Sequence, residues 1–340
     1  MASLFPQIGP DESNNRLVGI ARMAAEGEAL DEGHNVEYIT LENRSVLCRC
    51  TSKRVPFGWT INPYRGCEFA CKYCYARYTH EFMELRDGLD FERKIFVKQH
   101  TAWLLRQELK KVRTGESIAI GSATDPYQPA ERRFGITRAL LEEFSRHSGL
   151  RIGLITKSNL ILRDLELLQA VARNNRFGIH VTVTTIKTDL ARILEPRAPR
   201  PDLRLQAVQK LVEAGLHVGV SCSPVLPGIT DLPADLEKVV QAAAAAGARS
   251  VFANALYLKP CSSKVFMPFL KENFPQLVPL YEKRYTDRAF LPTEYRRRIS
   301  TLVSKYCEKY GIGKRRVDAL QRTSNTITPQ RGPEQMDLFA

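Results

Sequence analysis

The strongest constraint on the fold is a regular alternation of short apolar segments with amphipathic segments between residues 60 and 257. The apolar segments predict six strands, at 60–66, 117–124, 150–157, 178–185, 216–223 and 250–257. The spacing of apolar residues between them predicts helices at 100–112, 137–147, 162–174, 201–214 and 232–246. Because helices separate the strands, we expect βα units with right-handed crossovers and a parallel sheet.

Two of the predicted strands carry small polar residues on one face. Side chains alternate along a strand, so one face would hold His180, Thr182 and Thr184 and the other Val181 and Val183. The next strand repeats this division, with Gly219, Ser221 and Ser223 opposite Val218, Val220 and Cys222. An apolar outer face and a polar inner face favour a barrel-like sheet with a ligand inside. The alternative is that Ser and Thr are simply good strand formers here.

The chain divides into four expected regions. Residues 1–45 are polar and predict an extension, 46–260 hold the alternating core, 261–325 are helical and basic, and 326–340 predict a flexible tail. No apolar run is long enough to span a membrane, and the first residues lack the pattern of a signal peptide. We therefore expect a cytoplasmic protein.

Three cysteines, Cys67, Cys71 and Cys74, lie within eight residues in the segment "CEFACKYC". In a cytosolic chain such a cluster indicates metal ligands or catalytic groups rather than disulfides. A structural zinc site needs a fourth ligand, for which Cys48, Cys50 and His80 are candidates. An iron–sulfur cluster held by three cysteines instead leaves one iron open to a substrate or cofactor.

The cysteine segment resembles the signature of radical S-adenosylmethionine (radical SAM) enzymes, including the aromatic Tyr73 before the third cysteine. Further segments resemble the spore photoproduct lyase-like branch: "SATDPYQPAE" (122–131), "ITKS" (155–158), "HVTVTT" (180–185) and "LEPRAPRPDLRLQAV" (194–208). The likeness covers roughly residues 55–260. It implies an α/β fold, an incomplete (β/α)6 TIM-like barrel.

The resemblance also implies the cofactors. Cys67, Cys71 and Cys74 would each bind one iron of a 4Fe–4S cluster, and the amino and carboxylate groups of S-adenosylmethionine would bind the fourth. One electron from the reduced cluster would then cleave S-adenosylmethionine into methionine and a 5′-deoxyadenosyl radical, which takes hydrogen from the substrate. The electron would come from a flavodoxin- or ferredoxin-type donor.

Five residues are candidates for binding S-adenosylmethionine. The carboxylate needs a cation, for which Lys157 at a strand end is the candidate, and the amino group needs acceptors, for which Thr124 and Asp125 at the end of the second strand are candidates. Thr182 fits the ribose by alignment, and Tyr73 offers an aromatic edge for the adenine. The plainer interpretations are that Lys157 is a surface lysine and that Asp125, which precedes a proline, only forms a turn.

One position departs from the family pattern. Spore photoproduct lyase has a cysteine at the head of its second-strand segment, which returns a hydrogen atom to the product radical, whereas this chain has Ser122. A hydroxyl group is a far poorer hydrogen-atom donor than a thiol. Cys261, in "LKPCSSK", is the candidate replacement, with a plain loop thiol as the alternative. Cys222 lies on the face assigned to helix packing, so we expect a buried residue there.

The net charge of +13 is concentrated late in the chain. Residues 283–331 contain thirteen Lys and Arg against four Asp and Glu, a net of +9. The same segment includes the aromatic residues Tyr285, Phe290, Tyr295, Tyr306 and Tyr310. Basic groups and aromatic rings together indicate nucleic-acid binding, and DNA is favoured. The alternative is a solvated helix with an apolar stripe.

The last residues, Gln335, Met336, Asp337, Leu338 and Phe339, resemble the pentapeptide by which bacterial repair and replication proteins bind the DNA sliding clamp. The leading hypothesis is therefore a radical SAM enzyme acting on nucleic acid, related to DNA-repair lyases. A second hypothesis keeps this chemistry but has RNA, a peptide or a small metabolite as substrate. A third is a zinc-stabilised nucleic-acid-binding module without catalysis.

Overall fold

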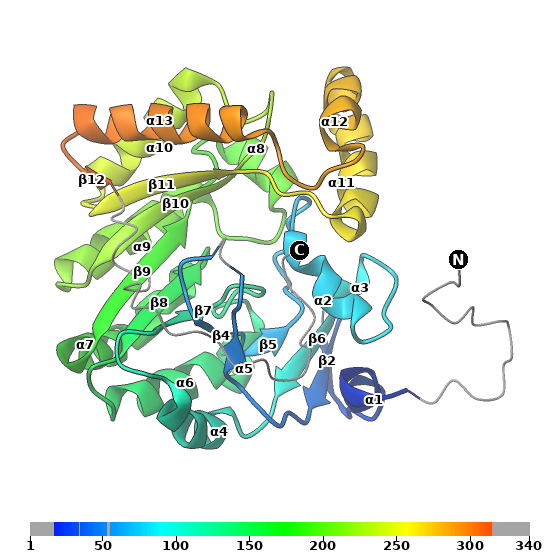
Figure 1. Cartoon of the computed structure of the whole chain (residues 1–340), viewed down its shortest axis with the longest axis vertical. Coiled ribbons are helices and arrows are strands. Elements are labelled where there is room, and N and C mark those ends of the chain that lie inside the picture. Colours follow the sequence, from blue (N-terminus) through cyan, green and yellow to red (C-terminus); the bar gives the residue numbers. More distant parts are fainter. Residues whose placement is uncertain (1–16, 34, 53–54, 315–340) are drawn as a thin grey trace, which may run out of the picture.

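The computed structural model describes residues 17–33, 35–52 and 55–314, which form two sheets and the helices packed on them (Figure 1). The larger sheet has eight strands in the order β12-β11-β10-β9-β8-β7-β4-β3. Their bounds are β3 Cys48–Arg49, β4 Trp59–Ile61, β7 Ser117–Ile120, β8 Arg151–Thr156, β9 Arg176–Thr182, β10 Val218–Val225, β11 Ser250–Ala255 and β12 Gly313–Lys314.

Every neighbouring pair from β4 to β12 is parallel, and β3 alone runs antiparallel, at the edge beside β4. The six predicted strands are β4, β7, β8, β9, β10 and β11, and their order in space is their order in the chain. The two edge strands, β3 and β12, are not paired with each other among the described residues. The sheet is therefore open, which confirms the predicted incomplete (β/α)6 barrel.

The helices that connect these strands are also close to their predicted positions. They are α4 Thr101–Glu108, α6 Ile136–Ser145, α7 Leu165–Asn174, α9 Pro201–Glu213 and α10 Pro233–Ala245. Short 3₁₀ turns extend two of them, η2 Leu109–Lys111 after α4 and η3 Asn159–Asp164 before α7. Additional short helices are α2 Tyr78–Glu81, α3 Asp90–Arg93, α5 Ala130–Phe134 and α8 Thr188–Leu194, with the 3₁₀ turn η1 Tyr75–Arg77.

The prediction of a single strand over residues 60–66 is wrong. Its start belongs to β4, while Tyr64–Arg65 form β5 in the other sheet. Asn62 separates the two, because its side chain accepts a hydrogen bond from the Ala123 backbone at 2.7 Å. The next residue is a proline, which has no N–H group to continue a ladder. This change of sheet directs the following cysteine segment across the end of the barrel.

The smaller sheet has the order β1-β2-β6-β5, and α1 Gly19–Ala25 contacts its second strand. Its other strands are β1 Ala29–Gly33, β2 Val36–Leu41 and β6 Lys94–Lys98. Residues 19–41, placed in the expected N-terminal extension, are thus largely in regular structure. Antiparallel pairing of β5 with β6 connects this sheet to the segment just before the first cysteine.

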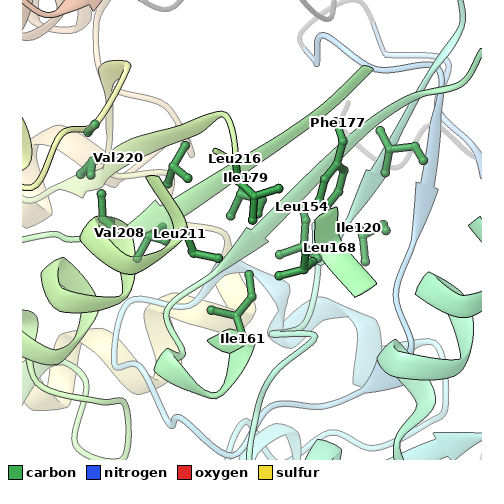
Figure 2. Packing of buried hydrophobic residues seen from close by; sticks show 14 of the residues in the cluster. Ile120, Leu154, Ile161, Leu168, Phe177, Ile179, Val208, Leu211, Leu216 and Val220 are labelled. Atoms are coloured by element: carbon green, nitrogen blue, oxygen red, sulfur yellow. The ribbon is translucent and has the colours of Figure 1, made fainter. Parts of the chain in front are cut away.

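The main core lies between the larger sheet and its helices (Figure 2). Val181, Val183, Val218, Val220 and Cys222 all belong to it, which confirms the predicted outer faces of β9 and β10. On the other face, a Cβ atom at Gly219 would lie 2.9 Å from the Nδ1 atom of His180. Glycine is therefore required there, because the barrel interior is already filled at that level.

After β11 the chain is helical, as predicted. The elements are α11 Pro260–Asn273, η4 Pro275–Leu277, α12 Val278–Tyr285 and α13 Thr293–Lys309. Helix α13 runs along β11 and buries Ile299, Val303 and Tyr306 in the main core (Figure 1). Tyr306 is thus part of the core rather than available to stack on a base.

The clamp-like pentapeptide and the rest of residues 315–340 lie outside the described residues. In the described part of the chain, no helix is both long and apolar enough to cross a membrane.

Candidate active site

The three clustered cysteines lie on one loop between β5 and η1 at the carboxyl end of the barrel strands. Cys67 and Cys71 are buried, and Cys74 is half-buried. Burial, together with the nearby Asp125, Cys71 and Cys74, raises the pKa of the Cys67 thiol well above its ordinary value. The three cysteines thus share one largely buried loop.

The backbone of this loop is shaped by two left-handed residues. Gly66 has φ +89°, and a Cβ atom there would lie 2.7 Å from the Lys94 carbonyl oxygen. Ala70, between the first two cysteines, has φ +54°, which costs an alanine about 1 kcal/mol. The surrounding contacts must outweigh this cost, and a loop held in this way presents its cysteines in a defined geometry.

A buried ion pair fixes the loop from the η1 side. Arg77 and Glu92 lie 2.7 Å apart, with side-chain exposures of 1% and 9%. Arg77 also donates a hydrogen bond to the Cys71 carbonyl oxygen at 3.1 Å. Arg77 therefore acts on the position of the second cysteine and not only on the stability of the helix.

A second network fixes the loop from the β7 side. The backbone N–H of Glu68 donates to the side-chain oxygen of Gln128 at 2.9 Å, and Thr124 donates to the Gly66 carbonyl oxygen at 2.6 Å. Gln128 also donates to the Thr124 hydroxyl at 3.0 Å. The sequence assigned Thr124 to the cofactor amino group, and here its hydroxyl group orients the cysteine loop. One lone pair of that hydroxyl is left for a further donor.

Asp125 and Lys157 come together where β7 and β8 end. Asp125 accepts hydrogen bonds from the Thr156 hydroxyl at 2.6 Å and from the Lys157 and Tyr127 backbone N–H groups at 2.7 and 3.0 Å. Oδ2 accepts only from Lys157 among these donors, so it retains an acceptor position for an amino group. The carboxylate is therefore more than a turn former.

The Lys157 ammonium group lies 5.7 Å from the centre of the Tyr73 ring. Burial disfavours its charged form, but Cys71 and Glu195 outweigh burial and raise the pKa of Lys157 above its ordinary value. The lysine is thus a cation directed to the cysteine loop rather than a surface residue. Its charge and position suit a carboxylate ligand.

Sequence reasoning missed Glu195 and Arg204, although both lie in the segment 194–208. Arg204 Nη2 is 2.5 Å from Glu195 Oε2, with side-chain exposures of 1% and 0%. Tyr73 donates its hydroxyl hydrogen bond to Glu195 Oε1, which also accepts from Thr184 at 2.9 Å. Burial opposes ionisation of Glu195, but Arg204 and Lys157 lower its pKa below the ordinary value.

Arg204 also reaches the candidate ribose residue. It donates a hydrogen bond to the Thr182 carbonyl oxygen at 3.1 Å, and the Thr182 side chain is buried on the inner face of β9. The only sequence signal for the pair was one Glu and one Arg nine residues apart near a helix start. No local pattern shows that they meet, because that depends on how α8 and α9 fold back on the loop.

Ser122 lies beside the cysteine loop, as its sequence position suggested. Its hydroxyl is 2.5 Å from the Thr60 hydroxyl and accepts from the Asn62 amide at 3.3 Å. Tyr75, which follows the third cysteine, donates a hydrogen bond to the Ser122 carbonyl oxygen. The position that carries a thiol in the resembling branch is thus a hydroxyl group hydrogen-bonded to two side chains, Thr60 and Asn62.

Cys261 is buried in the first turn of α11. It lines a small crevice with residues 85–88, Arg77, Glu81 and Lys264. The adjacent Ser262 donates a hydrogen bond to the Cys74 carbonyl oxygen at 2.8 Å. A hydrogen-donor role of Cys261 stays a prediction. Cys222 lies in the main core, and burial raises its pKa to about 12, which confirms it as a packing residue.

No three His, Cys, Asp or Glu side chains in the described part of the chain converge closely enough to hold a single metal ion. A 4Fe–4S cluster makes a different demand, because each cysteine binds a different iron atom. Three loop cysteines, a nearby lysine and a carboxylate with a spare acceptor position fit that cluster with S-adenosylmethionine on the fourth iron.

The sequence model of the Radical SAM superfamily matches residues 61–243. The chain belongs to the radical SAM superfamily. It is accordingly a radical SAM enzyme, and its cofactors are a 4Fe–4S cluster and S-adenosylmethionine.

Similar proteins come from bacteria and archaea. An uncharacterized Mycobacterium tuberculosis protein is 35% identical over 272 residues, covering 77% of this radical SAM chain and 80% of that protein. An uncharacterized Methanocaldococcus jannaschii protein is 28% identical over 237 residues, covering 67% and 83%.

Among solved structures, spore photoproduct lyase has the same fold. A variant with bound AdoMet and dinucleoside spore photoproduct has a TM-score of 0.61 and 16% identity, covering 80% of this chain and 79% of that chain. A cysteine-to-serine variant of the same enzyme gives the same values. These likenesses confirm the fold expected from the spore photoproduct lyase-like segments.

Proposed function

We propose that this radical SAM enzyme acts on nucleic acid, with DNA as the favoured substrate, in a lyase-like repair reaction. The observation that carries the proposal is a row of aromatic rings beside the cysteine loop, formed by Tyr75, Tyr257 and Phe290. The Tyr75 and Tyr257 ring centres are 6.1 Å apart, and Tyr257 stacks on Phe290 at 4.2 Å. All three side chains are half-buried, so each retains accessible surface.

The row extends from the cysteine loop to the carboxyl end of β11. Tyr75 follows Cys74 directly, Tyr257 follows β11, and Phe290 lies in the segment before α13. Lys259 adds a cation near the row, with its ammonium group 4.1 Å from the Tyr78 ring centre. Rings that can stack on bases next to cations that can pair with phosphates are the usual elements of a single-stranded nucleic-acid site.

When bound, the cluster and S-adenosylmethionine would supply a 5′-deoxyadenosyl radical that takes hydrogen from the substrate. The chain's own residues would hold and orient the parts. Cys67, Cys71 and Cys74 would bind iron, Lys157 the methionyl carboxylate, and Asp125 Oδ2 the amino group. The Tyr73 ring and Thr182 would lie against the adenosine.

The likeness to spore photoproduct lyase solved with a dinucleoside spore photoproduct supports a substrate of this class. The exposed arginines 296, 297 and 298 at the start of α13 add positive charge to the same end of the helix as Phe290. Residues 315–331, the rest of the predicted basic segment, lie outside the described residues. Charge thus supports the proposal, and the aromatic row is where we propose that the bases lie.

The test compares Tyr257→Ala with Tyr310→Ala, both in anaerobically reconstituted enzyme. Tyr310 precedes β12, which pairs with the start of β11, so it lies at the opposite end of the barrel strands from Tyr257. We expect Tyr257→Ala to weaken binding of ultraviolet-irradiated single-stranded DNA by about 5- to 100-fold, the usual effect of losing one base stack. Tyr310→Ala should bind like the wild type.

Turnover with deuterated DNA then tests the chemistry. Deuterium in 5′-deoxyadenosine would show that DNA is the hydrogen source. If RNA of the same sequence transfers deuterium and DNA does not, RNA is the substrate. If neither nucleic acid binds or transfers deuterium while S-adenosylmethionine is cleaved, the nucleic-acid proposal is wrong and a peptide or small metabolite is the substrate.

A further inference from the structure

Exposed basic residues gather at the end of α8 and in the turn to α9. They are Arg192, Arg197 and Arg200, with the partly exposed Ile193 among them, and Lys72 of the cysteine loop hydrogen-bonds to this turn through its backbone. We call these residues the 192–200 patch. Arg192, Arg197 and Arg200 are exposed, and 38% of Ile193 is exposed. In the described part of the chain, neither Lys72 nor Arg192 forms an ion pair with an acidic residue. The charges of these two residues are therefore free to meet a negative partner, whereas Arg200 forms an exposed ion pair with Asp202 at 2.9 Å.

The inner side of this turn contacts the cysteine loop directly. The Lys72 backbone N–H, one residue after Cys71, donates to the Leu194 carbonyl oxygen at 2.9 Å. The Arg197 N–H donates to the Phe69 carbonyl oxygen at 3.4 Å. The turn that carries the arginines of the patch is thus in direct backbone contact with the iron-binding loop, to which Lys72 itself belongs. Leu194 and Phe69 also share the apolar cluster that includes Cys67 and Cys71.

A hollow of about 110 Å³ opens in the same turn. Arg192 and Arg200 are among its lining residues, and so are the buried Glu195 and Arg204. Glu195 accepts the hydrogen bond of Tyr73, the residue just before Cys74. The hollow therefore joins the surface at Arg192 to Glu195, which in turn is hydrogen-bonded to the residue before the third cysteine.

We propose that the 192–200 patch is the docking surface for an acidic one-electron carrier protein that reduces the cluster. The inference rests on the proposed radical chemistry, which needs one electron delivered to the cluster that the cysteine loop behind this turn would hold. In the transfer the carrier loses one electron and the cluster gains it, and no covalent bond forms or breaks. Electron transfer weakens steeply with distance, so the carrier must dock where the protein layer over the cluster is thin.

The composition of the patch suits such a partner. Complexes of electron-transfer proteins are small and transient, and opposite charges steer their association. An exposed apolar residue such as Ile193 within a basic rim matches the usual division of an interface into centre and edge. Nucleic acid is the competing partner for a basic surface. The aromatic row that would stack bases comes from other segments, those following Cys74 and β11, so the patch is favoured for the carrier.

The test uses Arg192→Glu/Arg200→Glu, because both side chains are exposed and neither is assigned to cofactor or substrate. The control, Arg297→Glu/Lys305→Glu, makes the same charge change on the exposed face of α13. The probe is a recombinant flavodoxin, an acidic flavin protein. We expect the 192/200 variant to raise the flavodoxin dissociation constant at least tenfold at low salt, with a smaller difference at high salt. The control should change it less than twofold.

Dithionite, a small reductant that needs no docking surface, separates this inference from the proposed function. With dithionite the 192/200 variant should cleave S-adenosylmethionine at the wild-type rate, and with flavodoxin it should be at least tenfold slower. The inference would be overturned if the 192/200 variant bound flavodoxin as tightly as the wild type, or if it lost affinity for DNA and not for flavodoxin. Failure of the wild type to cleave S-adenosylmethionine with dithionite would count against the proposed function, while the binding measurement would still decide the patch.

Discussion

Arg204 and Glu195 form an ion pair behind the cysteine loop, with 2.5 Å between Arg204 Nη2 and Glu195 Oε2 and almost no exposure of either side chain. The second Glu195 oxygen accepts the Tyr73 hydroxyl group, so the pair connects α9 to the residue before the third cysteine. Two buried charges are expensive to transfer from water unless they are paired. The arrangement therefore holds Tyr73 only as long as both partners are present.

Glu195→Gln should lower the free energy of unfolding by about 3–5 kcal/mol, because Arg204 would stay buried without its counter-charge. The measurement is guanidinium denaturation at pH 7. Asp202→Asn is the control, since it breaks the exposed Arg200–Asp202 pair and should change stability by less than about 1 kcal/mol. Equal losses in the two variants would refute a structural role for the buried pair. Adding Arg204→Met to Glu195→Gln should recover part of the loss.

Cys71→Ala should lose the cluster. After anaerobic reconstitution, the wild type should hold about four irons with matching sulfide, and the variant should show no stable iron–sulfur absorbance. Cys48→Ala is the matched control, because Cys48 is exposed and lies on β3 rather than on the loop. If Cys71→Ala retained its iron and Cys48→Ala lost it, the ligand assignment would be wrong.

Lys157→Gln should weaken S-adenosylmethionine binding by about 30-fold or more, the effect of removing one partner of a desolvated charge pair. Equilibrium binding to the reconstituted protein measures it. Iron content must be determined in parallel, and we expect it to be unchanged because Lys157 binds the cofactor and not the cluster. Lys210→Gln, at an exposed position of α9, should bind S-adenosylmethionine normally. A Lys157 variant with wild-type affinity would exclude its assigned role.

His80 should make stability depend on pH. Burial lowers its pKa to about 4, and Nε2 lies 3.0 Å from the Lys94 carbonyl oxygen. The unfolded chain binds this proton below about pH 6.5 and the folded chain does not, so stability falls as the pH decreases from 6.5 towards 4. Between pH 7 and pH 5 this histidine should lower the free energy of unfolding by about 2 kcal/mol.

The variant His80→Phe tests this contribution. Phe91 and Phe96 already pack against the ring, so an apolar ring is the closest replacement. Denaturation is measured for both proteins at pH 7 and pH 5. Between these pH values the free energy of unfolding should fall by about 2 kcal/mol less in the variant than in the wild type. A parallel loss in both proteins would mean that other groups cause the acid sensitivity.

Deletion of residues 335–340 tests the predicted clamp contact. The truncated chain should lose binding to a recombinant bacterial sliding clamp, while its iron content and S-adenosylmethionine cleavage stay at the wild-type level. A Leu338→Ala/Phe339→Ala variant should match the deletion, because these side chains would enter the apolar pocket of the clamp. Clamp binding that survives both changes would remove this link to DNA.

Much of the fold was readable in the chain because strand and helix periods are local properties. The strands from β7 to β11 and their helices occur where the apolar pattern predicts them. The exception was 60–66, where the β-like residues continue but the Asn62 side chain bonds to Ala123, which is 61 positions away. A pattern of residue types cannot report such a bond, so one predicted strand became two strands in different sheets.

The amino-acid sequence by itself determined the βα order, the outer faces of β9 and β10, and the cysteine set, because periodicity and ligand spacing are written within short segments. Only the tertiary structure decided that Glu195 meets Tyr73 across 122 positions, that Tyr306 is core, and that the 192–200 patch lies over the cysteine loop. These facts depend on how α8 and α9 fold back on the loop. That packing follows from long-range burial and charge pairing, which no local pattern encodes.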